Sequence, residues 1–296
     1  MASSDINAKI ERLFIYPVKS CAGIEVQDIV LYDTGLDLDR AWMVVDHEGM
    51  FVSQREQAKL ALVQPTMRRG ELVLRAPGML ALHVNIDAVQ DATQVQVWDD
   101  TMPAFDMGDI AGQWFSDFLS LTAAGLPGKD AAKYRMVRFD PDHNRLADKK
   151  WTGAVDAPFQ FADGFPILLT STASMDGLNS KLAAAGVAAV GVERFRPNVV
   201  LSGIEAHDED RLANLRIAAG ETVELLPCKP CARCQIPNID PATGISSPEV
   251  NDTLQAYRAN AQMKGAITFG MNAIIRSGVG ATLRVGQVVT GTFKFD

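Results

Sequence analysis

Apolar and polar residues alternate along most of the first hundred positions of the chain. The pattern is clearest in three runs, KIERLFIYPVKS, DRAWMVVDHEGMFVSQRE and ELVLRAPGMLALHVN. Successive side chains of a strand point to opposite faces of a sheet, so a period of two residues indicates half-buried strands. Turn-forming sequences, His47-Glu48-Gly49 and Ala76-Pro77-Gly78, interrupt these runs. The first part of the chain is therefore predicted to be β-rich, and the final run TLRVGQVVTGTFKFD alternates in the same way.

Three segments predict helices instead. In DIAGQWFSDFLSL, Asp109 is expected to cap a helix. The apolar face of that helix is expected to comprise Ile110, Ala111, Trp114, Phe115 and Phe118. The run FPILLTSTASMDGLNSKLAAAG predicts an apolar strand, a capping Ser/Thr cluster and a helix that ends at Gly186. A further helix is expected to begin at Ser247-Pro248.

The chain has 296 residues, which is enough for two domains of ordinary size. A Pro/Gly pair followed by charged residues, in GLPGKDAAKYRMVRFDPDHNR, predicts a boundary near residue 130. We therefore expect one domain over residues 1–130 and a second over residues 131–296. The predicted fold class is α+β and β-rich, because strands dominate the pattern and helices interrupt it.

Composition and charge exclude several classes of protein. Hydrophobic residues make up 47% and charged residues 22% of the chain, as in soluble globular proteins. A net charge of −8 gives no broad positive field, so binding to nucleic acid or anionic lipid is not expected. The first residues lack the apolar core of a signal peptide, and the low-charge run LAAAGVAAVGV is too short to span a bilayer. These features predict a cytoplasmic protein that is not held in a membrane.

Three of the four cysteines lie close together in LPCKPCARCQIPNIDPATG. The spacing of Cys228, Cys231 and Cys234 suits a zinc or iron–sulfur site that lacks one ligand. The fourth cysteine, Cys21, lies more than two hundred positions upstream, and the histidines are scattered at His47, His83, His143 and His207. A disulfide is disfavoured in a reducing compartment.

A single reactive thiolate is the alternative to a metal site built from several cysteines. Lys229 and Arg233 place positive charge beside the cysteine run, which favours the thiolate form. A turn-rich segment, NIDPATG, follows it, and reactive residues often lie on such loops. A thiolate is both a nucleophile and a soft metal ligand.

The run PCARCQIPNIDPATG resembles the signature of the MOSC domain, a family related to the C-terminal part of molybdenum cofactor sulfurase. Four further runs are similar to family segments in the same order: IYPVKSCAGIEV, GLDLDRAWMVVDHEGMFVSQRE, RFRPNVVLSG and ITFGMNAIIRSGVGATLRVGQVV. The first two resemble the N-terminal β-barrel domain that accompanies MOSC in the amidoxime-reducing-component branch. The resemblance covers nearly the whole chain, and implies an N-terminal β-barrel-like domain followed by a MOSC β-barrel domain with flanking helices.

The resemblance also implies a site for the molybdenum cofactor, a metal held by a pterin dithiolene. It places the metal ligand, and hence the catalytic residue, on Cys234. It places cofactor-binding positions on Lys19, Ser20, Arg40, Asp163, Arg196, Ala232, Arg233 and Asn272. A thiolate suits molybdenum, and arginines suit the phosphate that the pterin carries.

Considered one at a time, these residues have simpler interpretations. A lone Lys19, Arg40 or Arg196 would be read as a surface charge. Asn198 suits a turn, and Cys21 a small buried hydrophobe. The tryptophans suit core or interdomain packing: Trp42, Trp98, Trp114 and Trp151.

The function implied by the resemblance is a molybdenum-dependent oxidoreductase that reduces N-hydroxylated or N-oxide compounds. Some bacterial relatives carry a ferredoxin domain after MOSC, whereas this chain ends at TGTFKFD. A separate electron-transfer protein is therefore expected, such as a ferredoxin, a flavoprotein reductase or a cytochrome. Two alternatives stay open: a sulfur carrier with a persulfide on Cys234, and a protein that stores or delivers the cofactor.

Overall fold

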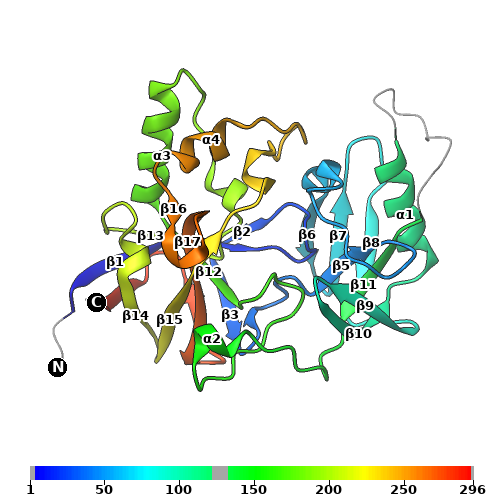
Figure 1. Cartoon of the computed structure of the whole chain (residues 1–296). Coiled ribbons are helices and arrows are strands. Elements are labelled where there is room, and N and C mark those ends of the chain that lie inside the picture. Colours follow the sequence, from blue (N-terminus) through cyan, green and yellow to red (C-terminus); the bar gives the residue numbers. More distant parts are fainter. Residues whose placement is uncertain (1–3, 122–132, 295–296) are drawn as a thin grey trace.

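A closed β-barrel forms one lobe of the computed structural model, which describes residues 4–121 and 133–294 (Figure 1). Within the described residues, seven strands form the ring, in the order β12 (Ile167–Ser171), β13 (Val199–Ser202), β1 (Ile6–Ile15), β19 (Val288–Phe293), β14 (Leu212–Ala219), β15 (Glu221–Ala232) and β17 (Ala266–Ser277). The ring closes where β12 pairs with β17 and Ile167 lies opposite Ala273. Strands β12 and β13 are parallel. A ring of seven strands cannot be antiparallel throughout, because strand direction would have to alternate around an odd number of strands. Strands β2 (Ile24–Val26) and β16 (Ala259–Asn260) extend the sheet.

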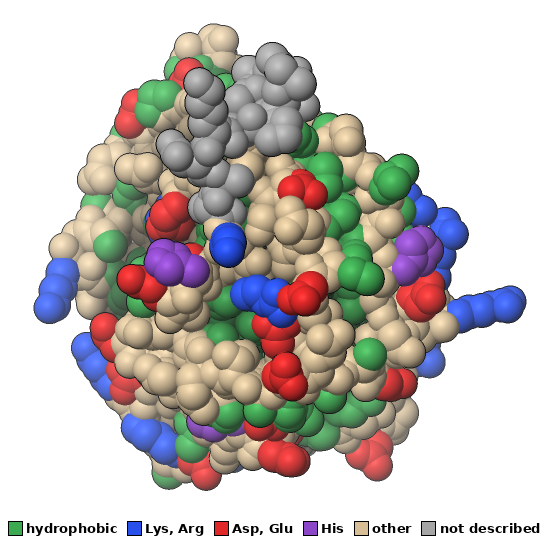
Figure 2. Space-filling view, turned by 90° about the vertical axis from the view of Figure 1, so that its right-hand side faces the viewer, with side chains coloured by type: hydrophobic (Ala, Val, Ile, Leu, Met, Phe, Trp, Pro, Cys, Tyr) green, Lys and Arg blue, Asp and Glu red, His purple; other side chains and the backbone are tan. Residues whose placement is uncertain are grey.

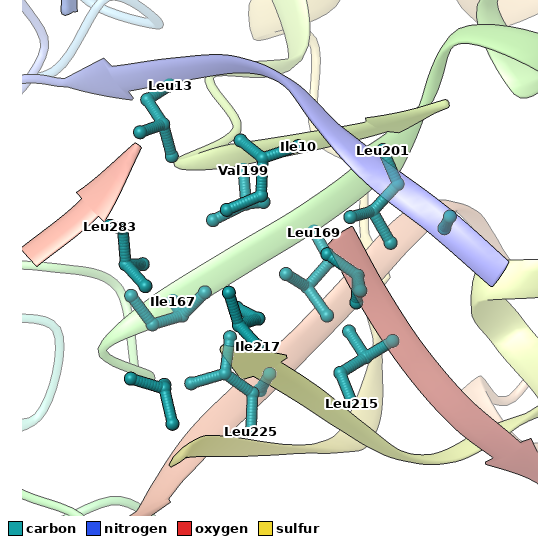
Figure 3. Packing of buried hydrophobic residues seen from close by; sticks show 14 of the residues in the cluster. Ile10, Leu13, Ile167, Leu169, Val199, Leu201, Leu215, Ile217, Leu225 and Leu283 are labelled. Carbon is teal, nitrogen blue, oxygen red and sulfur yellow. The ribbon is translucent and has the colours of Figure 1, made fainter. Parts of the chain in front are cut away.

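The interior of the barrel is filled by the apolar side chains that the alternating pattern predicts. Along β1, Ile6, Ala8 and Ile10 are buried while the residues between them are exposed. Figure 3 shows the side chains that meet in this interior, among them Ile10, Leu13, Ile167, Leu169, Val199, Leu201, Leu215, Ile217, Leu225 and Leu283. Each fully buried side chain of this size contributes about 1.5–3 kcal/mol to folding, so this core stabilises the barrel.

A second lobe lies beside the barrel, on the right of Figure 1. One of its sheets has the order β5 (Trp42–Val45), β11 (Arg135–Phe139), β10 (Asp100–Asp106) and β9 (Ala92–Val97). Another consists of β6 (Gln64–Arg68), β7 (Glu71–Arg75) and β8 (Leu82–Asn85). The remaining small sheet belongs to the barrel lobe instead: β18 (Thr282–Arg284), β3 (Asp28–Tyr32) and β4 (Gly35–Leu36) contribute Leu283, Leu31 and Leu36 to the barrel core. Helix α1 (Asp109–Ser120) packs onto the second lobe through Trp114, Phe115 and Phe118.

The remaining α-helices accompany the barrel: α2 (Lys149–Thr152), α3 (Thr172–Ala184) and α4 (Glu249–Gln255). The short 3-10 helices on the same side are η2 (Val192–Phe195), η3 (Asp208–Arg211), η4 (Ile236–Asn238) and η5 (Ala261–Met263). The 3-10 helix η1 (Ala58–Leu62) lies in the second lobe, where Leu60 joins the apolar cluster of Trp114 and Phe115. The start of α3 agrees with the prediction, because the Ser171 hydroxyl accepts a hydrogen bond from the Ser174 amide at 3.1 Å. Its end agrees as well, with Gly186 in the left-handed region at φ 74°. The β-rich α+β fold with a barrel and flanking helices is confirmed.

The first turn of α1 differs from the prediction. Gly108, at φ 91°, occupies the N-cap position, and Asp109 instead forms an ion pair with Arg135 at 2.7 Å. Ile110 is 80% exposed, so its predicted burial is wrong. The buried face is centred near Ala111 and Phe115, and Ile110 lies about 100° or more around the helix from that centre.

The order of segments along the chain does not follow the division into lobes. Strand β1 pairs with β13 and β19, so the beginning of the chain completes the barrel formed by its end. Strand β11 pairs with β5 and β10 in the other lobe. The boundary predicted near residue 130 lies outside the described residues, and the division into residues 1–130 and 131–296 stays a prediction.

The surface carries no dominant sign of charge on the face drawn in Figure 2, which is the right-hand side of Figure 1. Among its described residues, basic and acidic side chains are interspersed with hydrophobic ones. Over residues 4–121 and 133–294, no helix has both the length and the apolar character needed to cross a membrane.

Candidate functional site

A pocket between the two lobes brings together every residue that was predicted for the site. Its empty space measures about 860 Å³, including the part that opens to solvent. The predicted residues in its lining are Lys19, Ser20, Arg40, Asp163, Arg196, Ala232, Arg233, Cys234 and Asn272. They come from segments separated by up to 253 positions in the sequence, between Lys19 and Asn272. The geometry thus assembles one polar pocket; the role of each residue in binding stays a prediction.

The backbone of this pocket contains three left-handed residues that are not glycine. Ser20 has a φ of 69°, Arg40 of 54° and Arg196 of 56°. Such residues cost of order 1–3 kcal/mol and tend to cluster at functional sites, where the surrounding structure holds them. Arg196 reaches this conformation as the residue that ends η2.

Two arginines share one aromatic ring at the base of the pocket. The guanidinium carbons of Arg40 and Arg196 each lie 4.3 Å from the centre of the buried Tyr16 ring. Arg40 forms an ion pair with Asp39 and donates to the Arg196 carbonyl at 3.1 Å. Arg196 donates to the Cys21 carbonyl at 2.6 Å, and no carboxylate of the described residues pairs with it. Burial, and then the charge of Arg40, lower the pKa of Arg196 to about 10, so Arg196 is still a cation at neutral pH.

An ion pair at the pocket links the segment that follows β1 to the segment that precedes β12. The Lys19 ammonium donates to Asp163 at 2.6 Å and to the Phe161 carbonyl at 2.8 Å, and the indole N–H of Trp98 donates to the same carboxylate at 3.3 Å. The Lys19 side chain is 7% exposed and that of Asp163 is 69% exposed. Burial lowers the pKa of Lys19, while Asp163 opposes that shift. Burial acts to raise the pKa of Asp163, but the charge and hydrogen bond of Lys19, the hydrogen bond from Trp98 and the charge of Arg40 together bring it below its usual range.

Arg233 connects the cysteine segment to the barrel. Its guanidinium donates to the Phe269 carbonyl at 2.9 and 2.5 Å and to the Phe195 carbonyl at 2.9 Å. These bonds use several of the five N–H groups that a guanidinium offers. Arg233 therefore holds in place the backbone that carries Cys234, and fewer of its donors remain for a ligand.

The three crowded cysteines have three different surroundings. Cys228 packs beside the apolar cluster around Phe159 and Phe165, and burial raises its pKa to about 11. Cys231 lines the pocket, and burial raises its pKa as well. Cys234 is exposed, with its Sγ 3.9 Å from the Arg55 guanidinium.

This arrangement does not assemble a metal site from protein groups alone. In the described part of the chain, no set of three His, Cys, Asp or Glu residues is placed to hold a metal ion. The reason lies in strand β15, which ends at Ala232. Cys228 and Cys231 belong to this strand, whereas Cys234 follows it at the mouth of the pocket.

Two cationic residues of the pocket were missed by the sequence reasoning. Arg55 lies 4.5 Å from the Trp98 ring and 5.7 Å from the Phe51 ring, and Arg194 donates to the Pro237 carbonyl at 3.2 Å. Arg55 belongs to the run FVSQRE and Arg194 to VERFRPN, both next to residues that had been singled out. With them, the described lining contains six cationic side chains and one acidic one: Lys19, Arg40, Arg55, Arg194, Arg196 and Arg233, with Asp163.

The simpler interpretations of single residues have mixed outcomes. Cys21 is fully buried, as predicted, and so are Trp42 and nearly all of Trp114. Trp98 is 45% exposed and so is not a core residue; it contacts Phe51 and Asp163, and its role in interdomain packing stays a prediction. Asn198 lies at a bend before β13, where its side chain accepts from the Leu168 amide at 3.0 Å and donates to the Phe14 carbonyl at 3.3 Å.

Comparisons with known proteins agree with a chain built from two β-rich parts. Residues 7–122 match the model of the MOSC N-terminal beta barrel domain, and residues 156–290 match that of the MOSC domain. Mitochondrial amidoxime reducing component 2 of Rattus norvegicus is 32% identical, over 84% of this chain and 72% of its own length. Mitochondrial amidoxime-reducing component 1 of Homo sapiens is 31% identical over the same shares. Molybdenum cofactor sulfurase of Bos taurus is 29% identical, over 84% of this chain and 29% of its own length.

The two matched domains make this chain a MOSC-domain protein with a MOSC N-terminal beta barrel domain. The chain belongs to the MOSC family, and its relatives there include the mitochondrial amidoxime-reducing components.

Proposed function

We propose that this chain is a molybdenum-cofactor-dependent reductase of N-hydroxylated or N-oxide compounds, with Cys234 as the protein's ligand to the metal. The observation that carries the proposal is the position of this exposed thiol beside a pocket rich in cations, in a protein of net charge −8. An acidic protein gathers cations at one place when it binds an anion there.

The donor set of the pocket fits such a cofactor. One thiolate, without a protein cluster of metal ligands in the described residues, suits a metal whose other sulfurs come from the cofactor itself. Arg196, which has no carboxylate partner among those residues, suits a phosphate group. When bound, the cofactor would supply the two-electron chemistry that removes oxygen from the substrate, with two protons, as water.

The chain's own residues would bind and orient in this scheme. Arg196 and Arg40 would attract the phosphate, and the Lys19–Asp163 pair would hold the segments after β1 and before β12 together beside the cofactor. Arg233 would keep Cys234 in place through its carbonyl contacts. A separate electron-transfer protein as the reductant and a cytoplasmic location are further parts of the proposal.

Metal and pterin analysis tests the role of Cys234. The protein, a Cys234→Ala variant and a Cys228→Ala variant are produced in a host that synthesises the cofactor. We expect stoichiometric molybdenum in the wild type and in Cys228→Ala, whose thiol lies outside the pocket lining. We expect a loss of most of the metal in Cys234→Ala. Equal molybdenum in all three proteins would remove Cys234 as the anchor, and bound zinc in place of molybdenum would refute the proposal.

Turnover separates an enzyme from a storage or carrier protein. The molybdenum-loaded wild type is mixed with benzamidoxime and a chemically reduced dye, and formation of benzamidine is measured. Turnover that is lost in Cys234→Ala supports the reductase. Full molybdenum content without turnover of several N-oxygenated compounds favours storage or delivery. A persulfide on Cys234, detected by mass spectrometry in protein without molybdenum, favours the sulfur carrier.

A further inference from the structure

A second pocket adjoins the first on the side of the second lobe. Its empty space measures about 1320 Å³, including the part open to solvent. Aromatic side chains in its lining are Phe51, Trp98 and Tyr134. No residue predicted for the cofactor site lines this second pocket, so the cofactor proposal leaves its purpose unexplained.

Trp98 has an unusual conformation for its residue type. It lies in the tight turn between β9 and β10 with a φ of 56°, in the left-handed region that glycine and asparagine adopt at lower cost. The turn alone therefore does not explain a tryptophan at this position. The Trp98 ring is 45% exposed, and Phe51 meets it edge to face with the ring centres 5.0 Å apart. A hydrogen bond from the indole to Asp163, in the segment that precedes β12, orients it.

Arg55 connects the two pockets. It lines both, and its guanidinium lies 4.5 Å from the Trp98 ring and 3.9 Å from the Cys234 Sγ. A molecule that rests against Trp98 therefore has its reactive end about one side chain away from the candidate metal ligand.

We propose that the second pocket is a substrate subsite that binds a flat aromatic ring, with Trp98 and Phe51 as its stacking surfaces. This inference rests on the proposed function and names its substrate class: N-oxygenated compounds that carry an aromatic or heteroaromatic ring next to the N–O group. The ring packs against Trp98, and the N–O group extends past Arg55 toward Cys234. An exposed indole that is fixed in orientation loses little freedom when it binds such a ring.

Two probes that differ only by the ring test the subsite. Binding of benzamidoxime and acetamidoxime to the full-length protein is measured by calorimetry, and KM is measured for both with the molybdenum-loaded protein. We expect the wild type to prefer the aromatic probe about tenfold or more, as stacking contacts of this kind imply. In Trp98→Ala we expect the ratio of the two affinities, benzamidoxime over acetamidoxime, to fall toward one. The affinity for acetamidoxime itself should not change.

A Trp98→Phe variant is the matched control. It keeps an aromatic face but loses the hydrogen bond to Asp163, so it should retain most of the preference if stacking is the cause. A preference that is unchanged in Trp98→Ala, with wild-type thermal stability, overturns the subsite. A preference lost equally in both variants also overturns it, because the effect would then act through Asp163.

The subsite and the proposed function can fail separately. Ring-dependent binding that needs Trp98, without turnover of either probe, supports the subsite and refutes the reductase. Turnover of both probes with the same KM ratio in wild type and Trp98→Ala supports the reductase and overturns the subsite.

Discussion

At the scale of single residues, buried titratable groups make stability depend on pH. His207 precedes η3 with a φ of 67°, and its ring centre lies 5.8 Å from those of Tyr257 and Phe269. Burial, and then the charge of Arg258, lower the pKa of His207 to about 4. In the described structure its Nδ1 has no hydrogen-bond partner. The neutral ring is therefore the form that folding favours.

We expect the free energy of unfolding to decrease between pH 7 and pH 5 because of His207. The unfolded chain takes up the proton near the ordinary pKa of 6.5, whereas the folded protein does so only near pH 4. Stability from this group is present above pH 6.5 and is lost as pH falls toward 4, by about 1–2 kcal/mol at pH 5. Urea unfolding of the wild type and of His207→Asn, which tolerates the left-handed backbone, measures it. An equal decrease in both proteins would show that His207 is not the cause.

At the scale of elements, two helix N-caps differ in how deeply they are buried. Burial decides how much each cap contributes to the free energy of unfolding. Ser171 is fully buried and accepts from the Ser174 amide at 3.1 Å, and it donates to the buried Glu209 carboxyl at 3.0 Å. Asp148 caps the short helix α2 by accepting from the Lys150 amide at 2.9 Å, and it is exposed. Both side chains accept from a backbone amide in the first turn of their helix, but one is buried and the other exposed.

Ser171→Ala should lower the free energy of unfolding by about 2 kcal/mol or more, because it removes a cap and leaves Glu209 short of a donor. Asp148→Ala should cost about 0.5–1 kcal/mol, because water replaces the lost contact. Thermal and urea unfolding of the two variants measure the difference. Equal losses would mean that the contact with Glu209 contributes nothing to stability.

At the scale of the whole molecule, the position of β1 ties the two ends of the chain together. This strand lies between β13 and β19, and Leu13, on its inner face, is fully buried. Without it, the barrel has two unpaired strand edges and an open apolar interior. Exposed edges of this kind pair with other chains.

A fragment of residues 131–296 alone should therefore not fold as a stable monomer. We expect it to aggregate or to lack a cooperative unfolding transition, and we expect an added peptide of residues 4–16 to restore a transition. Size-exclusion chromatography and circular dichroism with and without the peptide measure this. A monomeric fragment that unfolds cooperatively without the peptide would show that the barrel closes without β1.

Much of the local structure could be predicted from the sequence, because its causes lie within a few residues. The period of two in KIERLFIYPVKS predicts a strand, and the Ser/Thr cluster before residue 172 predicts a helix start, as the structure confirms. The prediction that Ile110 belongs to the buried face of α1 was wrong, because periodicity also acts only within the helix. Helical periodicity indicates which residues share a face, but the partner of the helix decides which part of that face is buried.

What the sequence alone determined is the β-rich class, the main elements and a cysteine segment that resembles one family. The tertiary structure decided which cysteine is exposed, how Lys19 and Asp163 pair, and that Arg55 and Trp98 join the neighbourhood of Cys234. The physical reason is the range of the interactions. Propensity and periodicity act within one turn or one strand, whereas burial and pairing depend on contacts between segments that only the closed barrel and the lobe beside it bring together.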